Sequence, residues 1–253
     1  MPRLADRVAL VTGAGRGFGA AIAVALAREG ADVVVNYRAS ARQADEVAGT
    51  IRTLGRRTLV VQGDVAQPAD ADRVIAAALE GFGRIDVLVN NAGVMTPGPF
   101  LEVPVERWTE MFQINVIGTM LCTRAALPSM VERRRGRIVN LSSQLARLGS
   151  IARRGFAVYS ATKGAVESFT RAIAHEFGHL GITVNAIAPG GIETDMSRHV
   201  MTPEYRARRI AELPVNRLGS LDDVSACAVF LASDESAYLT GQVLHPSGGA
   251  VMP

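Results

Sequence analysis

The chain has 253 residues, of which 48% are hydrophobic and 5% aromatic, and it carries a formal net charge of +3. Acidic and basic residues are interspersed, and Cys122 and Cys227 form no CxxC pair, which argues against a disulfide framework, a metal site and a basic nucleic-acid-binding domain. The first apolar run has no secretory signal before it, and no apolar stretch approaches the roughly 20 residues of a membrane span. We therefore expect a cytoplasmic protein without a membrane segment.

Short apolar segments alternate with helical patterns along the whole chain. Strands are predicted at 7–13, 31–38, 57–65, 85–93, 136–143, 182–190 and 241–249. Helices are predicted between them at 17–30, 41–55, 69–83, 105–131 and 156–181, with a further helical stretch before the last strand. The strands are nearly continuous in Val, Ile and Leu, which is typical of a parallel sheet covered on both faces. The pattern predicts one α/β domain over residues 1–253, a doubly wound parallel sheet of the Rossmann type.

Residues 191–219 interrupt this alternation directly after the carboxyl end of a strand. Ligands bind at that end of the strands in open α/β sheets. We interpret the segment as a mobile lid over a substrate, and an ordinary surface insertion is the alternative.

The turn between the first strand and the first helix reads VTGAGRGFGAA. Glycines let the backbone turn tightly and approach a pyrophosphate, while the helix N-terminus supplies free N–H groups and the positive end of its dipole. Two registers fit, because Gly15, Gly17 and Ala20 match G-x-G-x-x-A whereas Gly13, Gly17 and Gly19 match G-x-x-x-G-x-G. Both predict a dinucleotide site, and a glycine-rich turn without a ligand is the alternative.

The end of the second strand, Asn36-Tyr37-Arg38, bears on which dinucleotide binds. Sites that prefer NAD usually carry an acid there, which bonds the ribose 2′-hydroxyl. The acid of this strand, Asp32, lies at its opposite end. Arg38 and Arg16, the latter in the glycine loop, can instead pair with a 2′-phosphate. We therefore predict NADP(H), with NAD(H) as the alternative.

Tyr159 and Lys163 lie four residues apart in a predicted helix and so share one of its faces. An unperturbed Tyr has a pKa near 10, and a neighbouring ammonium lowers it, which predicts a proton donor and acceptor tuned for catalysis. Ser142 and Ser143 end the preceding strand, at the edge where the glycine loop lies, and a hydroxyl there can hold a substrate oxygen against the phenol. A packing tyrosine and a surface lysine are the alternative.

Five segments together resemble the short-chain dehydrogenase/reductase family in their order and spacing: TGAGRGFG, NNAG, NLSS, YSATK and APGGIET. The resemblance covers essentially the whole chain. Within the family, the segments VVVNYR and GITVNAIAPGGIETDM resemble those of the 3-oxoacyl-carrier-protein-reductase-like members. The resemblance implies hydride transfer with NADP(H) between a small-molecule ketone, possibly carrier-bound, and a secondary alcohol. It also implies a homotetramer built on the helices near 105–131 and 157–179 and on the C-terminal strand.

The resemblance also implies roles for individual residues. Tyr159 would be the general acid in reduction, and Lys163 would lower its pKa and bind the nicotinamide ribose. Ser143 would bond the carbonyl, and Asn115 would anchor a water that relays protons to Lys163. The predicted cofactor-binding residues are Gly13, Gly15, Arg16, Gly17, Phe18, Gly19, Asn36, Tyr37, Arg38, Asp64, Val65, Asn91, Ala92, Gly93, Tyr159, Lys163, Pro189, Gly190, Ile192 and Thr194.

One departure from the family concerns the segment before Tyr159. Sixteen positions separate Ser143 from Tyr159, a few more than is usual, and the segment carries Arg147, Arg153 and Arg154. We expect it to line the mouth of the substrate site. Rival functions are an NAD-linked alcohol or sugar dehydrogenase on the same scaffold and a catalytically silent nucleotide-sensing protein.

A compact basic run, Arg133-Arg134-Arg135 with Arg137 just after it, stands outside these motifs. No aromatic platform accompanies it, so we interpret it as a solvated loop. Docking of an acidic carrier or of a phosphorylated substrate is the alternative.

Overall fold

The computed structural model describes residues 2–149, 155–194 and 201–252, and within them seven strands form one sheet. All the strand pairs are parallel, in the order β3-β2-β1-β4-β5-β6-β7. The strands are β1 (Val8–Val11), β2 (Asp32–Tyr37), β3 (Thr58–Gln62), β4 (Val87–Asn90), β5 (Gly136–Leu141), β6 (Ile182–Ile187) and β7 (Val243–Leu244). The main helices are α1 (Gly17–Arg28), α2 (Ala41–Thr53), α3 (Pro68–Phe82), α4 (Val105–Phe112), α5 (Gly118–Glu132), α6 (Leu145–Leu148), α7 (Ala157–Phe177), α8 (Pro203–Glu212) and α9 (Leu221–Ala232). The predicted doubly wound α/β fold is confirmed.

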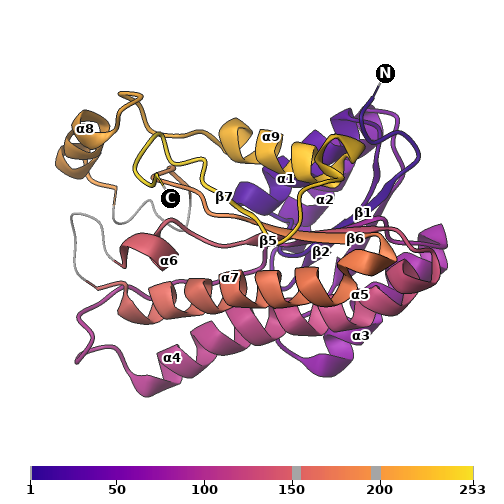
Figure 1. Cartoon of the computed structure of the whole chain (residues 1–253), viewed down its shortest axis with the longest axis horizontal. Helices are drawn as coiled ribbons and strands as arrows, with labels where there is room; N and C mark the ends of the chain where they lie inside the picture. The colour runs from indigo at the N-terminus through magenta and orange to yellow at the C-terminus, as the bar shows by residue number, and fades with distance from the viewer. Residues whose placement is uncertain (1, 150–154, 195–200, 253) are drawn as a thin grey trace.

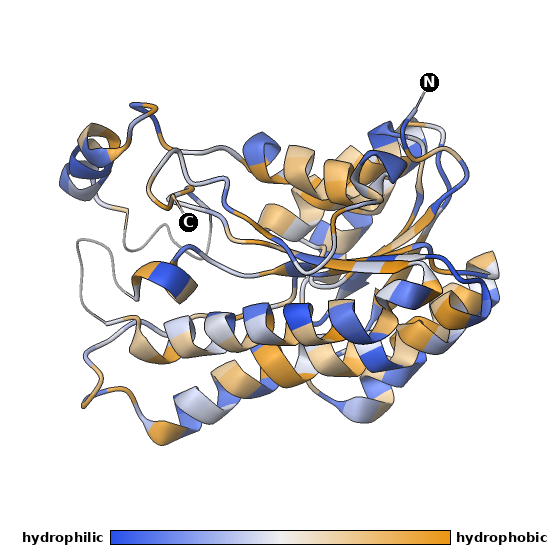
Figure 2. Cartoon of the chain, viewed as in Figure 1, coloured by the Kyte–Doolittle hydropathy of each residue, from blue (hydrophilic) through white to orange (hydrophobic). Residues whose placement is uncertain are grey.

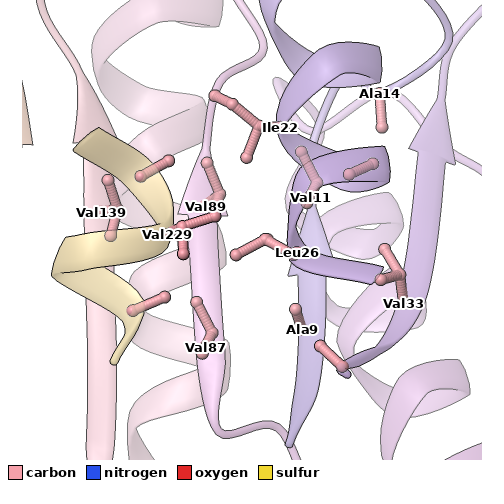
Figure 3. Packing of buried hydrophobic residues seen from close by; sticks show 14 of the residues in the cluster. Ala9, Val11, Ala14, Ile22, Leu26, Val33, Val87, Val89, Val139 and Val229 are labelled. Carbon is pink, nitrogen blue, oxygen red and sulfur yellow. The ribbon is translucent and has the colours of Figure 1, made fainter. Parts of the chain in front are cut away.

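Helices cover both faces of the sheet. Figure 1 shows α1, α2 and α9 on one side and α3, α4, α5 and α7 on the other. Alternate residues of each strand enter opposite layers, so Val11 packs in the cluster that contains α1 and α9, whereas Leu10 packs in the cluster that contains α3 and α5. Figure 3 shows the first cluster, in which Ile22, Leu26 and Val229 lie over the strands. Because both faces are covered, most strand residues are apolar, and Figure 2 shows orange segments among white and blue ones along the central layer.

The strand register places three chain segments at one edge of the sheet. Val11 at the end of β1 pairs with Val35 of β2 on one side and with Val89 of β4 on the other. The strand order reverses between β1 and β4, and the loops that follow these two strands diverge there. A crevice at this switch point is the usual ligand site of doubly wound sheets.

The helix predicted over 105–131 is interrupted in the structure. A π-helical turn, Gln113–Ile117, joins α4 to α5 and contains Asn115. Turns of this kind are rare and are found mostly at functional sites. By length and composition alone, the stretch Val105–Glu132 could cross a membrane, and the mean hydropathy of its most apolar window is 1.3. This finding corrects the expectation that no apolar stretch approaches the length of a membrane span. Since 61% of that window is buried, the stretch reads as a core helix.

The basic run is only in part the solvated loop that we expected, because Arg134 and Arg135 are exposed whereas Arg133 and Arg137 are held against the fold. Arg133 Nη1 donates to Asp86 Oδ1 over 2.7 Å, Arg135 Nη2 donates to Asp234 over 3.0 Å, and Arg137 is 6% exposed with its Nη2 3.2 Å from Asp234. The run follows the end of α5, where carbonyls of the last turn attract cations, and Arg133 Nε donates to Ser129 O over 3.1 Å. These arginines tie together the turns at the edge where the strands begin.

The segment predicted as a lid is partly helical. A parallel bridge between Ile192 and Gly219 closes its two ends, and α8 lies between them. Thr202 caps α8, its hydroxyl accepting from Tyr205 N over 3.2 Å. Figure 2 shows α8 as largely hydrophilic, and Figure 1 places it at one end of the molecule beside the C-terminus. Residues 195–200 lie outside the described part of the chain, so movement of this segment stays a prediction.

Candidate active site

The glycine loop between β1 and α1 has one of the two registers that the sequence allowed. Gly13 and Gly17 have φ of +62° and +56°, which favours glycine. A Cβ on Gly19 would lie 2.4 Å from Gly13 O and 2.4 Å from Asn91 Nδ2, so no side chain fits there. Gly15 has neither constraint, because its Cβ would make ordinary contacts at 3.5 Å. The functional pattern is therefore G-x-x-x-G-x-G over Gly13, Gly17 and Gly19.

The first turn of α1 is open to a ligand. Its N-cap residue, Arg16, makes no side-chain capping bond, and the turn contains no acidic residue. The N–H groups that begin a helix have no partner within it, and they carry the positive end of the helix dipole. The loop thus offers donors and a partial positive charge to a phosphate.

Two asparagines hold this loop in place. Asn36 Oδ1 accepts from Gly13 N over 3.2 Å, and its Nδ2 donates to Val61 O and Gly63 O over 3.3 and 3.1 Å. Asn91 Nδ2 donates to Thr12 O over 2.9 Å and to Gly13 O over 3.1 Å. Both side chains bond the backbone and support the loop, a role that the sequence did not indicate. Both also line the neighbouring cleft, so their contact with a cofactor stays a prediction.

A cleft of about 260 Å³ opens beside the loop at the carboxyl edge of the sheet. Most of the predicted cofactor residues line it, namely Gly13, Gly15, Arg16, Gly17, Phe18, Asn36, Tyr37, Arg38, Asp64, Val65, Asn91, Ala92, Gly93, Tyr159, Lys163 and Thr194. The lining also includes residues that the sequence analysis did not single out, Ala39, Ser40, Gly63, Val94, Ile114 and Leu141. The cleft therefore runs from the end of β2 to the Tyr159 hydroxyl.

Four predicted cofactor residues lie outside this lining. Gly19 is a packing residue under the loop. A Cβ on Gly190 would meet Ser247 Cα at 2.6 Å, so a glycine at this position lets the loop after β6 approach the loop after β7. Pro189 O accepts from Gln144 N over 3.1 Å, and Ile192 forms the bridge to Gly219. The segment 189–194 is thus held beside the end of β5, and Thr194 is its part of the cleft wall.

The far end of the cleft carries two exposed arginines. Arg38 is 54% exposed at its side chain, and its Nη1 lies 3.7 Å from Asp64 Oδ2. An exposed pair at this distance is worth little, so the guanidinium is free to take a stronger anion. Asp32 is buried at the opposite end of β2 and pairs with Arg56 and Arg57, each over 2.8 Å. It cannot reach this end of the cleft.

Tyr159 and Ser143 meet at the near end. Ser143 follows β5, Tyr159 lies in the first turn of α7, and the Ser143 hydroxyl is near enough to the phenol to lower its pKa by hydrogen bonding. Burial raises the pKa of Tyr159 to about 12, against the smaller lowering effect of the bond with Ser143. The expectation that the pKa of Tyr159 lies below its ordinary value is therefore wrong for the protein by itself, because loss of water around the phenol outweighs its neighbours.

Lys163 lies one turn further along α7 and is 4% exposed. Its Nζ donates to Leu141 O over 2.7 Å and stands 5.7 Å from the centre of the Tyr159 ring. Burial lowers the pKa of Lys163 to about 8. The bond to β5 fixes the ammonium at the cleft wall, within reach of a ligand beside Tyr159.

Asn115 connects the loop after β4 to α7. Its Oδ1 accepts from Val94 N over 2.8 Å, and its Nδ2 donates to Val94 O over 2.9 Å and to Thr162 Oγ1 over 3.1 Å. The π-turn directs this side chain inward, where it is 1% exposed. Because Oδ1 and Nδ2 already make these hydrogen bonds, a water that relays protons at Asn115 would have to bind another atom of the residue.

The two serines at the end of β5 have different surroundings. Ser142 is buried and lines the cleft, and its Oγ donates to Glu167 Oε1 over 2.9 Å, whereas Ser143 lies beside Tyr159 and outside the cleft lining. Glu167 was not singled out from the sequence, although it follows Lys163 by four residues and so shares its helix face. The structure thus brings Ser143, Tyr159, Lys163 and Asn115 together around one end of the cleft.

Comparison with known proteins identifies the family. The family model described as Enoyl-(Acyl carrier protein) reductase matches residues 13–251. A 3-oxoacyl-[acyl-carrier-protein] reductase of Synechocystis sp. is 42% identical, with 100% of both chains covered. The chain belongs to the short-chain dehydrogenase/reductase family.

Two solved structures of this short-chain dehydrogenase/reductase fold show the same arrangement of the chain. A blue fluorescent protein from a metagenomic library, in complex with NADPH, superposes with a TM-score of 0.91 at 35% identity, over 99% of this chain and 100% of that one. A gluconate 5-dehydrogenase from Burkholderia cenocepacia, in complex with NADP and tartrate, gives 0.91 at 34% identity, over 98% and 96%. The names of the Synechocystis and Burkholderia cenocepacia proteins both describe oxidoreductases and differ in substrate.

The substrate mouth of this short-chain dehydrogenase/reductase is only partly described. After Ser143 the chain forms the short helix α6, which carries Arg147, and Ser160 Oγ donates to Gly149 O over 3.1 Å, so the segment lies against α7. Arg153 and Arg154 lie outside the described residues. The expected role of the segment at the substrate mouth stays a prediction.

Proposed function

We propose that the protein is an NADP(H)-dependent oxidoreductase that interconverts a ketone and a secondary alcohol, with Tyr159 as general acid and base. The observation that carries this proposal is the position of Tyr159 on the cleft wall, with Lys163 Nζ fixed 5.7 Å from its ring by a bond to Leu141 O and with Ser143 beside it. A protein that only binds a nucleotide has no need of this set. The proposal is also in keeping with the oxidoreductase names of the relatives.

The cleft fits a dinucleotide phosphate. Gly13, Gly15 and Gly17 line the cleft without side chains, and the first turn of α1 is uncapped. Among the described residues the end of β2 has no acidic neighbour except Asp64, which faces Arg38. Arg38 and Arg16 would hold the 2′-phosphate, and Lys163 would hold the nicotinamide ribose. The Burkholderia cenocepacia enzyme, solved with NADP, supports this choice by similarity.

The residues of this chain would then handle the carbonyl oxygen and its proton. Ser143 donates a hydrogen bond to the carbonyl and aligns it with Tyr159. Tyr159, whose pKa of about 12 keeps it protonated at neutral pH, supplies the proton as negative charge develops on that oxygen. Lys163 stabilises the resulting phenolate by its charge. The bound cofactor would supply the hydride, and the protein provides position and the proton.

The class of substrate is suggested by the names of the relatives. A small ketone is the general form, and a 3-oxoacyl group, free or held on a carrier, is the form suggested by the Synechocystis relative. An NAD-linked alcohol or sugar dehydrogenase is the second candidate, since a gluconate 5-dehydrogenase has the same fold.

A panel of ketones with NADPH tests the proposed function. We expect a loss of NADPH absorbance with at least one 3-oxoacyl thioester or simple ketone, and a slower or absent reaction with aldoses. A nucleotide-sensing protein would bind NADPH, as followed by its fluorescence, and oxidise it with none of the panel. That result would contradict the proposal.

We further propose that the protein assembles as a homotetramer. Apolar side chains lie exposed along α4 and the π-turn, with Val105, Phe112 and Ile117 exposed by 59%, 39% and 38%. Burying such a face against a symmetry mate removes apolar surface from water, and two self-complementary interfaces generate a tetramer with D2 symmetry.

Light scattering measures this assembly directly. We expect a mass of four chains at micromolar concentration, and a smaller species for Phe112→Lys, because the charge would be buried in the interface. Leu54→Lys is the matched control, since Leu54 is equally exposed, at 39%, and follows the end of α2. A wild-type monomer, or equal masses for all three proteins below four chains, would contradict the tetramer.

A further inference from the structure

A second cavity, of about 400 Å³, lies at the edge of the sheet opposite the cleft. It is formed by residues 2–7 before β1, by the turns before β4 and β5, and by Asp234 after α9. Five arginines line it, Arg3, Arg7, Arg84, Arg133 and Arg135, together with the aspartates Asp6, Asp86 and Asp234. The proposed oxidoreductase chemistry uses none of these residues.

The buried aspartate of this cavity is fully engaged. Asp86 Oδ2 accepts from Val8 N over 2.8 Å and from Arg84 Nε over 3.0 Å, and its Oδ1 accepts from Arg133 Nη1 over 2.7 Å. Its lone pairs are taken by these donors, so it has little capacity to ligate a metal cation.

Asp234 is surrounded by cations. Arg7 Nη2 donates to both of its oxygens over 2.8 and 2.7 Å, and Arg135 and Arg137 approach it to 3.0 and 3.2 Å. One carboxylate therefore serves three guanidinium groups. A ligand that enters the cavity therefore meets these arginines, with Asp6 as a further exposed carboxylate at the lining.

Positive charge exceeds negative charge around the cavity. Arg3 is paired with Glu29 over 2.8 Å and lies 3.9 Å from Glu235. Around the cavity six arginines, counting Arg137, thus face three aspartates and these two glutamates, an excess of one positive charge. Within the described residues Arg7 bonds only through Nη2, so its other nitrogens keep their donors. Burial lowers the pKa of Arg137. The charge of Asp234 raises this pKa, whereas the charges of Arg7 and Arg135 lower it, as expected where cations are crowded together.

We propose that this cavity binds a diphosphate-type anion, either inorganic pyrophosphate or the diphosphate group of a nucleotide. Guanidinium groups bind phosphate oxygens in pairs through two parallel N–H bonds. A multivalent anion would balance the excess positive charge, and several arginines can contact it at once because the site is concave. Since the cavity and the cleft lie at opposite edges of the sheet, both can be occupied together.

Calorimetric titration of pyrophosphate into the protein saturated with NADP⁺, at constant ionic strength, tests the site. We expect one equivalent to bind, and Arg135→Gln and Arg84→Gln each to weaken it about tenfold, the effect of one lost charge-assisted bond. These side chains are 50% and 43% exposed, and their aspartates keep other donors, so both variants should fold with an unfolding temperature near that of the wild type.

Two controls separate the cavity from the rest of the surface. Arg124→Gln, at an exposed arginine of α5 paired with Asp72, should not change the affinity for pyrophosphate, and neither should Arg16→Gln in the cleft. An affinity that falls with Arg16→Gln and not with Arg135→Gln would place the anion in the cleft and overturn the proposal. Absence of measurable binding by the wild type would overturn it as well.

A parallel titration with ADP identifies the source of the diphosphate. Tighter binding of ADP than of pyrophosphate, still sensitive to Arg135→Gln, would support a nucleotide. Tighter binding of pyrophosphate with the same sensitivity would support the free anion.

Discussion

Tyr159→Phe is expected to lower turnover by about 10²–10⁴-fold, the range for loss of a general acid. The ring stays in place and only the hydroxyl that bonds Ser143 is removed, so NADPH binding, read from its fluorescence, should survive. The measurement is steady-state reduction of the best ketone, with binding measured in the same buffer.

The control for this change is Tyr238→Phe. Tyr238 is fully exposed and remote from the cleft lining, so its loss of a hydroxyl should leave turnover near that of the wild type. Near-normal turnover of Tyr159→Phe would show that the catalytic assignment is wrong, whatever the outcome for the control.

The pH dependence of ketone reduction and of alcohol oxidation follows from the protonation state of Tyr159. Burial raises the pKa of Tyr159 to about 12, so the phenol is protonated across the neutral range and reduction has its acid. Oxidation of the alcohol needs the phenolate as base, and its population grows as the pH rises toward that pKa. The rate of alcohol oxidation should therefore rise with pH across the neutral and alkaline range, whereas ketone reduction should not, as pH profiles of the two directions would show.

A preference for NADPH over NADH on the order of 10²-fold in kcat/KM is the second large effect that we expect. A charge-assisted hydrogen bond contributes roughly 1.5–3 kcal/mol, and about 1.4 kcal/mol is a tenfold effect. Arg38 and Arg16 can each make one to the 2′-phosphate, and the sum is reduced because both side chains are largely exposed. The preference should also shrink at high salt.

Charge reversal at Arg38 separates this preference from general binding. Arg38→Asp would place a second carboxylate beside Asp64, which repels a phosphate and accepts from a ribose hydroxyl, so most of the preference should disappear. Arg16→Ala should lose less. Arg42→Asp on α2 is the control, because Arg42 is 91% exposed, pairs with Glu46 and is not part of the cleft lining.

The decisive comparison uses wild-type protein, one substrate and both cofactors. Equal efficiencies, or faster turnover with NADH, would show that the end of β2 was misread and would favour the NAD-linked dehydrogenase. Loss of the preference in Arg42→Asp would mean instead that net charge, and not the site, selects the cofactor.

Local sequence patterns determined the architecture of this protein. Runs of Val, Ile and Leu alternating with helical periodicity predicted the parallel sheet, because residues buried on both faces must be apolar throughout. The glycines after β1 and the pairing of Tyr159 with Lys163 could also be found locally, since a turn and a helix face depend on residues close in the sequence.

Contacts between segments far apart in the sequence decided the glycine register, the pKa of Tyr159 and the partners of the arginine run. Which glycine register operates depends on Asn91 lying 2.4 Å from the position of a Cβ on Gly19, and Asn36 became a loop support because β3 lies beside it. Burial by the assembled fold, rather than the neighbouring ammonium, sets the pKa of Tyr159 in the protein by itself. The arginine run follows the same principle, because Asp234 is about a hundred residues away from it in the chain and only the folded edge of the sheet brings them together.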